Sequence, residues 1–256
     1  MATIDEFIAE AKTPRLSPWE TLKRFVGRGD RDEQYYLSLN DYTKRIFDIA
    51  AASALLVATG PIILLSCSAV RLTSKGKSIY VQERYGNHGW FNILKIRTMY
   101  DNVQPIYSDE GFRISPEGDN RVTRVGRILR DTHIDELPQL INVLKGDLSL
   151  IGPRARPKEE IKAMIGMHDE KAVLGFGEGQ SLYMQGTNVK YILDVPQGIS
   201  GFCQTYTTRE YDKKEAIFYD SVLAAMYRTQ WMVGWHRHFA QRTFRAAFRS
   251  DPDKQQ

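Results

Sequence analysis

The stretch IAAASALLVATGPIILLSCSAV spans residues 49–70 and contains no charged side chain. Its length of about 22 residues is what a helix needs to cross the hydrocarbon core of a membrane. The run is longer than the apolar part of a signal peptide and follows about 45 mostly polar residues, which argues against a cleaved leader. A buried helix of a soluble core is also disfavoured, because no polar face recurs at helical spacing. The stretch therefore predicts a membrane helix.

Gly60 and Pro61 lie near the middle of this stretch. A proline there removes one backbone donor and clashes with the preceding turn, so the helix should break or kink. Each half then has about 11 residues, which is too few to span a bilayer. Cations favour the cytoplasmic side of a membrane. They flank the stretch at both ends, as Lys44, Arg45, Arg71, Lys75 and Lys77.

Two cytoplasmic ends require a helix that turns back. We therefore expect a proline-broken re-entrant helix hairpin, which enters one leaflet of the membrane and returns. A kinked helix that crosses the membrane once, with incidental cations after it, is the alternative. Asp48 at the start of the segment is costly in lipid unless it pairs with a cation, and Lys44 and Arg45 are the nearest partners.

The overall composition is that of a folded domain. The chain has 256 residues, 42% hydrophobic and 26% charged, which excludes a disordered or collagen-like chain. Its two cysteines, Cys67 and Cys203, lie far apart, which argues against a secreted disulfide scaffold and favours a reducing compartment. The net charge of +4 is a mild excess that suits an acidic surface or a phosphorylated substrate.

The sequence around the apolar stretch predicts an α+β fold that is mainly helical. Residues 1–42 contain two capping-box spacings, which predict two short helices. The second helix would present Trp19, Leu22 and Val26 either to a lipid surface or to the domain. The expected organisation is then a re-entrant segment at 43–77, a cytoplasmic catalytic domain at 78–210, and C-terminal helices at 211–256.

Three local patterns lie in the first part of the expected catalytic domain. Residues 78–84 and 90–97 are rich in β-branched and aromatic residues and flank a glycine-containing turn, which predicts a β-hairpin. The polar stretch 101–120 predicts a loop. Leucines at helical spacing, with Pro138 at the start and glycine at the end, predict a helix at 136–145.

The second part is expected to contain a variable insertion at 158–195. It begins with a candidate helix at 158–167, and three glycines at 175–179 predict a loop. Beyond Tyr211, a helical pattern with many aromatic and basic residues continues to Phe248. Such a pattern suits either an amphipathic interfacial helix or a packed core helix.

The densest collection of polar residues lies between positions 95 and 156. Several arginines surround one adjacent carboxylate pair, Asp135 and Glu136. Guanidinium groups match phosphate oxygens, and carboxylates can bind a metal ion or attack phosphorus, so the combination indicates phosphoryl transfer. A position at the start of a helix favours anions. Because successive helical side chains point about 100° apart, we expect separate tasks for the two carboxylates.

The same residues are compatible with a helix cap and surface ion pairs. His133 is a candidate base beside the carboxylates. The sequence contains no Walker A loop, no HExxH, no paired CxxC and no complete dinucleotide fingerprint. It contains no known nucleic-acid-binding motif either, so no nucleic-acid partner is expected.

Several ordered segments resemble the bacterial sugar transferases, which move a sugar 1-phosphate from a nucleotide sugar to a polyprenyl phosphate. The resemblance covers residues 43–156 in register and resumes at 198–204. The matching segments are KRIFD at 44–48, QERYG at 82–86, KIRTM at 95–99, DNRVTRVGRILR at 119–130, DELPQ at 135–139, NVLKGD at 142–147, GPR at 152–154 and GISGFCQ at 198–204.

The resemblance implies a phosphoglycosyl transferase that is monotopic on the cytoplasmic face of a bacterial inner membrane. Asp135 would attack the sugar-proximal phosphorus of a UDP-sugar and release UMP. Polyprenyl phosphate would then attack the covalent phosphosugar, in the first membrane step of a glycan or exopolysaccharide pathway. Glu136 would hold Mg²⁺ and Arg130 would orient the carboxylates. The substrate-binding residues implied are Lys95, Arg97, Thr98, Arg121, Arg154 and Gln204.

A membrane segment suits this chemistry, because a lipid phosphate is confined to the headgroup plane and a dipping hairpin would fix the height of the site. The implied partners are a UDP-sugar, polyprenyl phosphate and membrane lipid, and a homodimer is compatible with them. The chain departs from the family pattern at Ala155, at Gln197 and around Thr208 and Arg209. These departures motivate the alternative of a catalytically inactive scaffold in a polysaccharide assembly complex.

Overall fold

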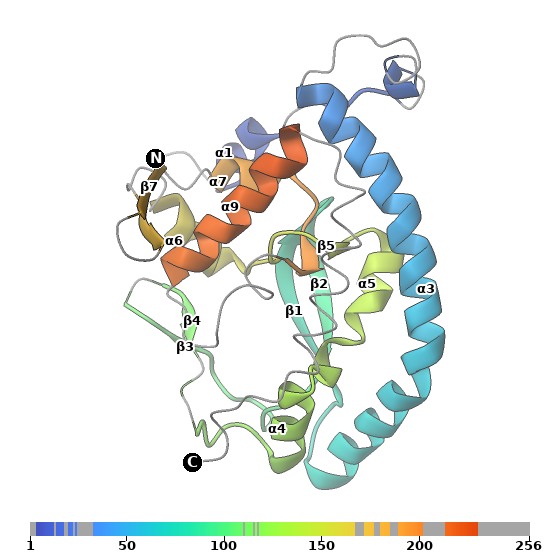
Figure 1. The fold of residues 1–256 in the computed structure, drawn as a ribbon. Helices are drawn as coiled ribbons and strands as arrows, with labels where there is room; N and C mark the ends of the chain where they lie inside the picture. The colour runs from blue at the N-terminus through green and yellow to red at the C-terminus, as the bar shows by residue number, and fades with distance from the viewer. Residues whose placement is uncertain are drawn as a thin grey trace.

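The computed structural model of the chain is drawn in Figure 1. It describes residues 4–12, 14–17, 20–22, 24, 33–109, 111–114, 116, 118–166, 172–176, 180–184, 189–201 and 213–229. One long helix runs along one edge of the molecule, a twisted β-hairpin lies beside it, and shorter helices lie on the other side (Figure 1). Among the described residues, the prediction of a mainly helical fold with small sheets is confirmed.

The long helix, α3, comprises Glu33–Thr73 and continues through Pro61. Its C-terminal half turns inward beneath the domain, so the helix is bent (Figure 1). The expected break at Pro61 is therefore wrong, because the helix continues through this residue. A single proline removes only one intrahelical hydrogen bond, and the flanking turns keep theirs. The helix begins ten residues before the expected segment at 43–77, so the N-terminal extension runs directly into it.

Most of the apolar surface of α3 faces away from the protein. Val57, Leu64, Leu65 and Leu72 are each at least 70% exposed. In the described part of the chain, α3 is the one helix whose length and composition are sufficient to cross a membrane. Only 6% of its most apolar window is buried, whereas the core helix of a soluble protein would be mostly buried.

One side of the C-terminal half of α3 packs on the domain. Val70 is buried against Ile96 and Leu129, and Ile63 and Cys67 of α3 lie at the same cluster. Ile134, the residue before Asp135, also packs there. The apolar helix therefore supports the segment that carries the carboxylate pair.

The predicted hairpin is confirmed. β1 (Ile79–Gly86) pairs antiparallel with β2 (Gly89–Ile96), and the connecting turn is shorter than expected, with Asn87 and His88 between the strands. Gly89 has φ +109°, a conformation that L side chains rarely adopt. Within the expected loop at 101–120, a two-residue strand pair forms between β3 (Ile106–Tyr107) and β4 (Arg113–Ile114).

Two short helices follow the hairpin. α4 (Arg124–Asp131) is capped by Thr123, whose side chain accepts a hydrogen bond from the Gly126 amide at 2.9 Å. The 3₁₀ turn η1 (Ile134–Glu136) precedes α5 (Gln139–Lys145). Asn142 fixes α5 to β2, because it accepts from the Leu94 amide at 3.0 Å and donates to the Asn92 carbonyl at 2.9 Å.

A parallel pair that the sequence does not predict joins β5 (Ser149–Ile151) to β8 (Gly198–Ser200). The two strands approach closely at their glycines. A Cβ on Gly198 would lie 2.1 Å from the Gly152 nitrogen, and one on Gly152 would lie 2.2 Å from the Pro196 carbonyl oxygen. Only glycine fits at these two positions.

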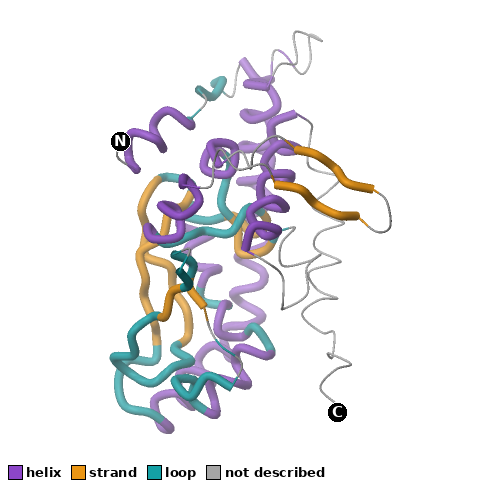
Figure 2. The backbone as a smooth tube through the Cα atoms, turned by 90° about the vertical axis from the view of Figure 1, so that its left-hand side faces the viewer, coloured by secondary structure: helices purple, strands orange, loops and turns teal. Residues whose placement is uncertain are grey.

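The segment between β5 and β8 contains the predicted helix, observed as α6 (Lys158–Gly166), and a second helix, α7 (Val189–Asp194). Between them, β6 (Ala172–Phe176) pairs antiparallel with β7 (Gln180–Met184), with Gly175 opposite Ser181. The loop expected at 175–179 is therefore wrong at Gly175 and Phe176, which lie in a strand. Figure 2 shows this hairpin projecting from the side of the molecule.

The N-terminal segment is fastened to the domain. α1 (Ile4–Ala11) packs beside α7. The second capping box is confirmed, because the Glu20 amide donates to Ser17 Oγ at 3.2 Å and the Ser17 amide donates to Glu20 Oε2 at 3.0 Å. Arg15 then pairs with Asp41 of α3 at 2.6 Å.

The last described helix, α9 (Lys213–Thr229), packs on α3 and α7. It forms the first part of the helical pattern expected from Tyr211 to Phe248. The rest of that pattern lies outside the described residues, as do Trp19, Val26, Cys203, Thr208 and Arg209.

Candidate functional site

The two carboxylates lie on η1, between α4 and α5. We expected them at the start of the following helix, but α5 begins only after Pro138. Proline has no amide hydrogen, so the bonds here run from residue i to i−3, from the Leu137 amide to the Ile134 carbonyl at 3.2 Å and from the Ile141 amide to the Pro138 carbonyl at 3.1 Å. His133 precedes the turn in the left-handed region with φ +55° and is exposed.

The two carboxylates have different surroundings. Glu136 Oε1 accepts a hydrogen bond from Lys95 Nζ at 2.6 Å. Burial alone would raise the pKa of Glu136, but Lys95 and Arg154 lower it to about 2. Asp135 is 8% exposed, and no described residue hydrogen-bonds to its carboxylate. Burial, together with the charge of Glu136, raises the pKa of Asp135 to about 6. The expectation of separate roles for the pair is compatible with these surroundings.

Three cations from separate segments surround Glu136. Lys95 lies on β2 and Arg84 on β1, and the antiparallel register places both on one face of the hairpin. Arg154 follows β5, in a bridge with Gly198. Burial and the charge of the neighbouring Arg154 lower the pKa of Arg84 to about 10, so it remains a cation at neutral pH. Cations therefore outnumber carboxylates at this point, which suits a substrate with several negative charges.

Arg84 is the member of this cluster that the sequence reasoning did not single out. It is 7% exposed, and its guanidinium donates to the Ala155 carbonyl at 2.7 Å and to Gln82 Oε1 at 3.0 Å. Its Nε is buried and has no hydrogen-bond partner in the part of the chain that the structure describes. Arg84 belongs to the QERYG segment that matches the family. Only the fold shows that its side chain binds the Ala155 carbonyl, directly after Arg154.

Arg130 reaches the site from the last turn of α4. Its Nε donates to Thr98 Oγ1 at 2.8 Å, and its charge acts to lower the pKa of Asp135. α4 can lie this close to Thr98 because Gly126 has no side chain, and a Cβ there would lie 1.9 Å from the Thr98 carbonyl oxygen. The structure thus brings Arg130 and Thr98 to the carboxylates, together with Lys95 and Arg154.

Two other predicted substrate-binding residues are engaged elsewhere. Arg97 donates to the backbone carbonyls of Ser74 and Lys75 at the end of α3. Arg121 forms a bidentate pair with Asp119. Its Nε donates to Oδ1 at 2.8 Å, and a terminal guanidinium nitrogen donates to Oδ2 at 2.6 Å. The sixth, Gln204, lies outside the described residues.

The predicted membrane-flanking residues at 44–48 fix α3 to β5 and α5. Lys44 Nζ lies 3.7 Å from Asp48 Oδ2 and donates to Ser149 Oγ. Asp48 also accepts hydrogen bonds from Ser149 Oγ at 2.5 Å and from the Leu150 amide at 3.0 Å. The expectation that Asp48 has a cationic partner is confirmed for Lys44. Arg45 instead donates to the last carbonyls of α5, those of Val143 and Leu144.

The structure explains one departure from the family pattern. Gln197 is buried, and its amide nitrogen donates to the Ile192 carbonyl at 2.6 Å and to the Val195 carbonyl at 2.9 Å, at the end of α7. Its backbone amide donates to Asn87 Oδ1 at 2.7 Å, a bond that proline could not make. Ala155, the other departure within the described residues, contributes its backbone carbonyl to Arg84.

The carboxylate pair can hold a divalent cation only with help from a substrate. No group of three or more acidic, histidine or cysteine side chains with metal-binding geometry occurs in the described ranges. Mg²⁺ commonly binds through one or two carboxylates, several waters and substrate phosphates. Asp135 and Glu136, beside an excess of cations that favours phosphate, fit such an ion if it arrives with a diphosphate.

Comparisons with known proteins identify the family. A family model described as bacterial sugar transferase matches residues 39–250. Over 115 residues, the chain is 48% identical to a UDP-glucose:undecaprenyl-phosphate glucose-1-phosphate transferase of Caulobacter vibrioides, covering 44% of this chain and 42% of that protein. It is 36% identical over 143 residues to the exopolysaccharide production protein ExoY of Rhizobium meliloti, covering 51% of this chain and 61% of that protein.

A third relative carries a different sugar in its name. The chain is 42% identical over 114 residues to a UDP-N-acetylgalactosamine-undecaprenyl-phosphate N-acetylgalactosaminephosphotransferase of Aeromonas hydrophila, covering 44% of this chain and 26% of that protein. The chain thus aligns with between about a quarter and three fifths of the length of these relatives. Because the family model matches most of its length, the chain belongs to the bacterial sugar transferase family.

Proposed function

We propose that the chain is a phosphoglycosyl transferase that transfers a sugar 1-phosphate from a UDP-sugar to a polyprenyl phosphate such as undecaprenyl phosphate. The observation that carries the proposal is the composition of one small region. A buried carboxylate with no hydrogen-bond partner among the described residues lies beside a carboxylate paired with Lys95, among additional cations, on a turn that packs against the apolar helix. The three relatives named above support the reaction class through the activities or pathway in their names.

In the first step, a carboxylate oxygen of Asp135 attacks the sugar-proximal phosphorus of the UDP-sugar. The bond from that phosphorus to the bridging oxygen breaks, UMP leaves with the electron pair, and the phosphosugar remains on Asp135. The pKa of about 6 leaves Asp135 mostly ionised at neutral pH. A free carboxylate needs no base to attack, so His133 is not required in this step.

In the second step, a phosphate oxygen of the polyprenyl phosphate attacks the same phosphorus. The bond to Asp135 breaks, the carboxylate is regenerated, and a polyprenyl diphosphosugar is formed. No other reactant is needed, because one phosphorus–oxygen bond forms and one breaks in each step. The site therefore has to hold two phosphorylated substrates in turn.

The cations around η1 offset the charge of these substrates. Arg84 and Arg154 lie next to Glu136, where a diphosphate would lie, and the charge of Arg130 favours the ionised form of Asp135. We further propose that Glu136 holds Mg²⁺ together with the substrate diphosphate, where the ion would stabilise the leaving UMP. Lys95 keeps Glu136 ionised for this task.

The proposed location is the cytoplasmic face of a bacterial inner membrane, with α3 entering one leaflet and returning. Three observations support this topology. α3 bends in its C-terminal half (Figure 1), cations flank its apolar part at both ends, and its C-terminal half packs on Ile134 beside the carboxylates. A lipid-borne phosphate can meet Asp135 only if the site lies at headgroup level, and this packing would hold it there.

The decisive test is intact-mass measurement of the full chain after exposure to UDP-sugars and Mg²⁺ without acceptor. We expect a phosphosugar adduct with at least one donor, and its mass identifies the sugar class. The matched control is Asp135→Asn, which should form no adduct. If a broad donor panel gives neither adduct nor UMP release with polyprenyl phosphate present, the chain is a scaffold and the proposal is wrong.

Topology is tested separately by labelling. Single cysteines at Tyr42 and Lys77, both exposed, are placed in a variant without Cys67 and Cys203. In sealed inverted membrane vesicles, a membrane-impermeant maleimide should label both positions. Labelling of one position only would show that α3 crosses the membrane once.

A further inference from the structure

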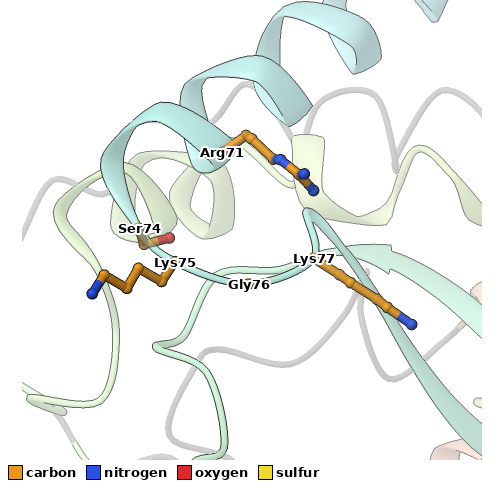
Figure 3. A pocket seen from close by; sticks show the side chains of 5 residues that line it. All are labelled: Arg71, Ser74, Lys75, Gly76 and Lys77. Carbon is orange, nitrogen blue, oxygen red and sulfur yellow. The ribbon is translucent and has the colours of Figure 1, made fainter.

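The end of α3 forms an open hollow that the proposed reaction does not use. The hollow has a volume of about 350 Å³ and is lined by Arg71, Ser74, Lys75, Gly76 and Lys77. Figure 3 shows the three cationic side chains extending from this turn in different directions. All three are exposed, and none has a carboxylate within ion-pair distance among the described residues.

The backbone of this turn is firmly held. Arg97 donates to the Ser74 carbonyl at 3.3 Å, to Ser74 Oγ at 2.8 Å and to the Lys75 carbonyl. Gly76 has φ +102°, and a Cβ there would lie 2.5 Å from a carboxylate oxygen of Asp101. Asp101 is directed to Arg97, 4.0 Å away, which partly neutralises it. The turn is therefore a built feature whose outward charge is cationic.

The surroundings identify the chemistry of a ligand. Leu72, the residue after Arg71, is 86% exposed and belongs to the apolar surface of α3. Helix C-termini attract cations, so the position itself gives no affinity for an anion, and the three side chains must supply it. A molecule that combines a phosphate with hydrocarbon chains would place its chains along α3 and its phosphate beside this cationic turn.

Two lipid-borne phosphates have this chemistry, namely the headgroup of an anionic phospholipid and the polyprenyl phosphate substrate. The hollow favours the headgroup. Its cations are exposed lysine and arginine side chains. A substrate phosphate that must react at one phosphorus needs a fixed geometry, which the cations around η1 provide and this turn does not.

We propose that the turn formed by Arg71, Ser74, Lys75, Gly76 and Lys77 binds the phosphate of an anionic phospholipid headgroup. The inference rests on the membrane placement in the proposed function. Bound lipid would hold the C-terminal end of α3 at the headgroup plane, and with it Arg97, which lies two residues from Lys95. The partner is a bulk lipid of the membrane that contains the enzyme, and the site is separate from the one that performs the chemistry.

The test uses the full chain in a neutral detergent, to which phosphatidylglycerol or phosphatidylcholine is added, with the midpoint of thermal unfolding as readout. A ligand that binds the folded state raises this midpoint. We expect a larger rise with phosphatidylglycerol, and the difference should shrink at about 0.5 M salt. Lys75→Gln/Lys77→Gln should weaken the apparent affinity for phosphatidylglycerol about 25-fold, or about fivefold per lysine.

The matched control is Lys158→Gln/Lys162→Gln on α6, which removes the same charge from two exposed lysines elsewhere. It should retain the wild-type response. The proposal is overturned if both double variants lose the response equally, if the wild type shows no preference for phosphatidylglycerol, or if Lys75→Gln/Lys77→Gln responds as the wild type does.

Two further measurements distinguish a phospholipid headgroup from polyprenyl phosphate and from free phosphate as the ligand. If the double variant loses the response to polyprenyl phosphate but keeps that to phosphatidylglycerol, the turn is an acceptor site and the proposal is wrong. A wild-type response to inorganic phosphate equal to that to phosphatidylglycerol would contradict lipid recognition. Adduct formation on Asp135 is measured in detergent without added lipid, so failure of the proposed reaction and failure of this inference are distinguishable.

Discussion

The junction between α3 and β5 and the turn η1 both bury charged side chains, but they treat them differently. At the junction, the Asp48 carboxylate accepts hydrogen bonds from Ser149 and the Leu150 amide and lies 3.7 Å from Lys44. At η1, Asp135 has no described hydrogen-bond partner, and Arg84 has a buried Nε without one. The first region is complete as it stands, whereas the second leaves polar capacity for a ligand.

The two regions therefore differ in how far their buried charges are paired. A buried charge without a partner destabilises the fold, and such charges are common at functional sites. At η1, the pKa of Asp135 is raised and that of the adjacent Glu136 is lowered, although both side chains belong to the same short turn. Substitutions at the two regions should therefore change stability and activity in different proportions.

The largest effect is expected for Asp135→Asn. UMP release should fall about 10⁶-fold, the order found when a covalent nucleophile is removed. Burial raises the pKa of Asp135 from 3.8 to about 6, so ionisation at neutral pH works against folding. The variant should therefore be more stable at pH 7, by roughly 1–3 kcal/mol. Thermal unfolding at pH 7 checks this.

Glu136→Gln is the matched comparison. The pKa of Glu136 is lowered, so its ionised form stabilises the folded state above about pH 4.5, and this stability is lost as the pH falls towards 2. The amide should lower the unfolding midpoint at pH 7. If both variants shift the midpoint in the same direction, the contrast between the two carboxylates is wrong.

At the junction, Asp48→Asn should lower the free energy of unfolding by about 3 kcal/mol, because Lys44 remains buried without its carboxylate. Activity of the folded fraction should change little. Denaturant unfolding of the full chain in detergent measures the effect. The double variant Lys44→Met/Asp48→Leu removes both charges and should be less destabilised than Asp48→Asn. Greater destabilisation would show that the unpaired charge of Lys44 is not the main cause of the loss of stability.

A smaller effect is expected for Arg84→Met. The variant loses a charge beside Glu136 and the hydrogen bond to Ala155, and we expect the KM for the UDP-sugar to rise about tenfold, with a smaller change in kcat. Arg84→Lys keeps the charge and should recover part of this loss. Arg121→Met, which removes an arginine fully engaged by Asp119 and the Gln104 carbonyl, should leave KM within about twofold.

The smallest expected effect is on pH dependence. Asp135 must be ionised to attack, so the rate of UMP release should rise with pH through a midpoint near 6 and then level off. Lys95 acts to lower the pKa of Asp135, so Lys95→Met should move the midpoint upward and Lys95→Arg should not. A profile that is flat between pH 5 and 8 would show that the titration of Asp135 does not limit the reaction.

Features set by short-range chemistry were predictable from the sequence. The β1–β2 hairpin follows from β-branched runs around a glycine turn, and α6 from local helical signals. The pairing of Asp48 with Lys44 follows from their i,i+4 spacing on one helix. The carboxylate pair was identified because arginines and adjacent acids are a composition typical of phosphate chemistry. What these features share is a cause within a few residues of the feature itself.

Features that depend on distant segments were not predictable in this way. The pairing of β5 with β8 joins residues on opposite sides of a long insertion, and nothing in either three-residue strand identifies its partner. The support that Arg84 gives to Ala155 depends on that arrangement. Arg97 belongs to a motif with Lys95, yet it binds the end of α3, because the approach of that helix is also a tertiary feature.

The close contact of Gly152 with Gly198 fixes both ends of the segment between β5 and β8. Hydrogen bonds from the Gly198 amide to the Pro153 carbonyl and from the Gly152 amide to the Ser200 carbonyl, both 2.8 Å, fix where the chain leaves the site and where it returns. α6 and α7 contribute buried residues to the core, but the β6–β7 hairpin projects between them (Figure 2). A hairpin of another length should therefore be tolerated there without displacing Arg154, because a longer loop adds little closure entropy.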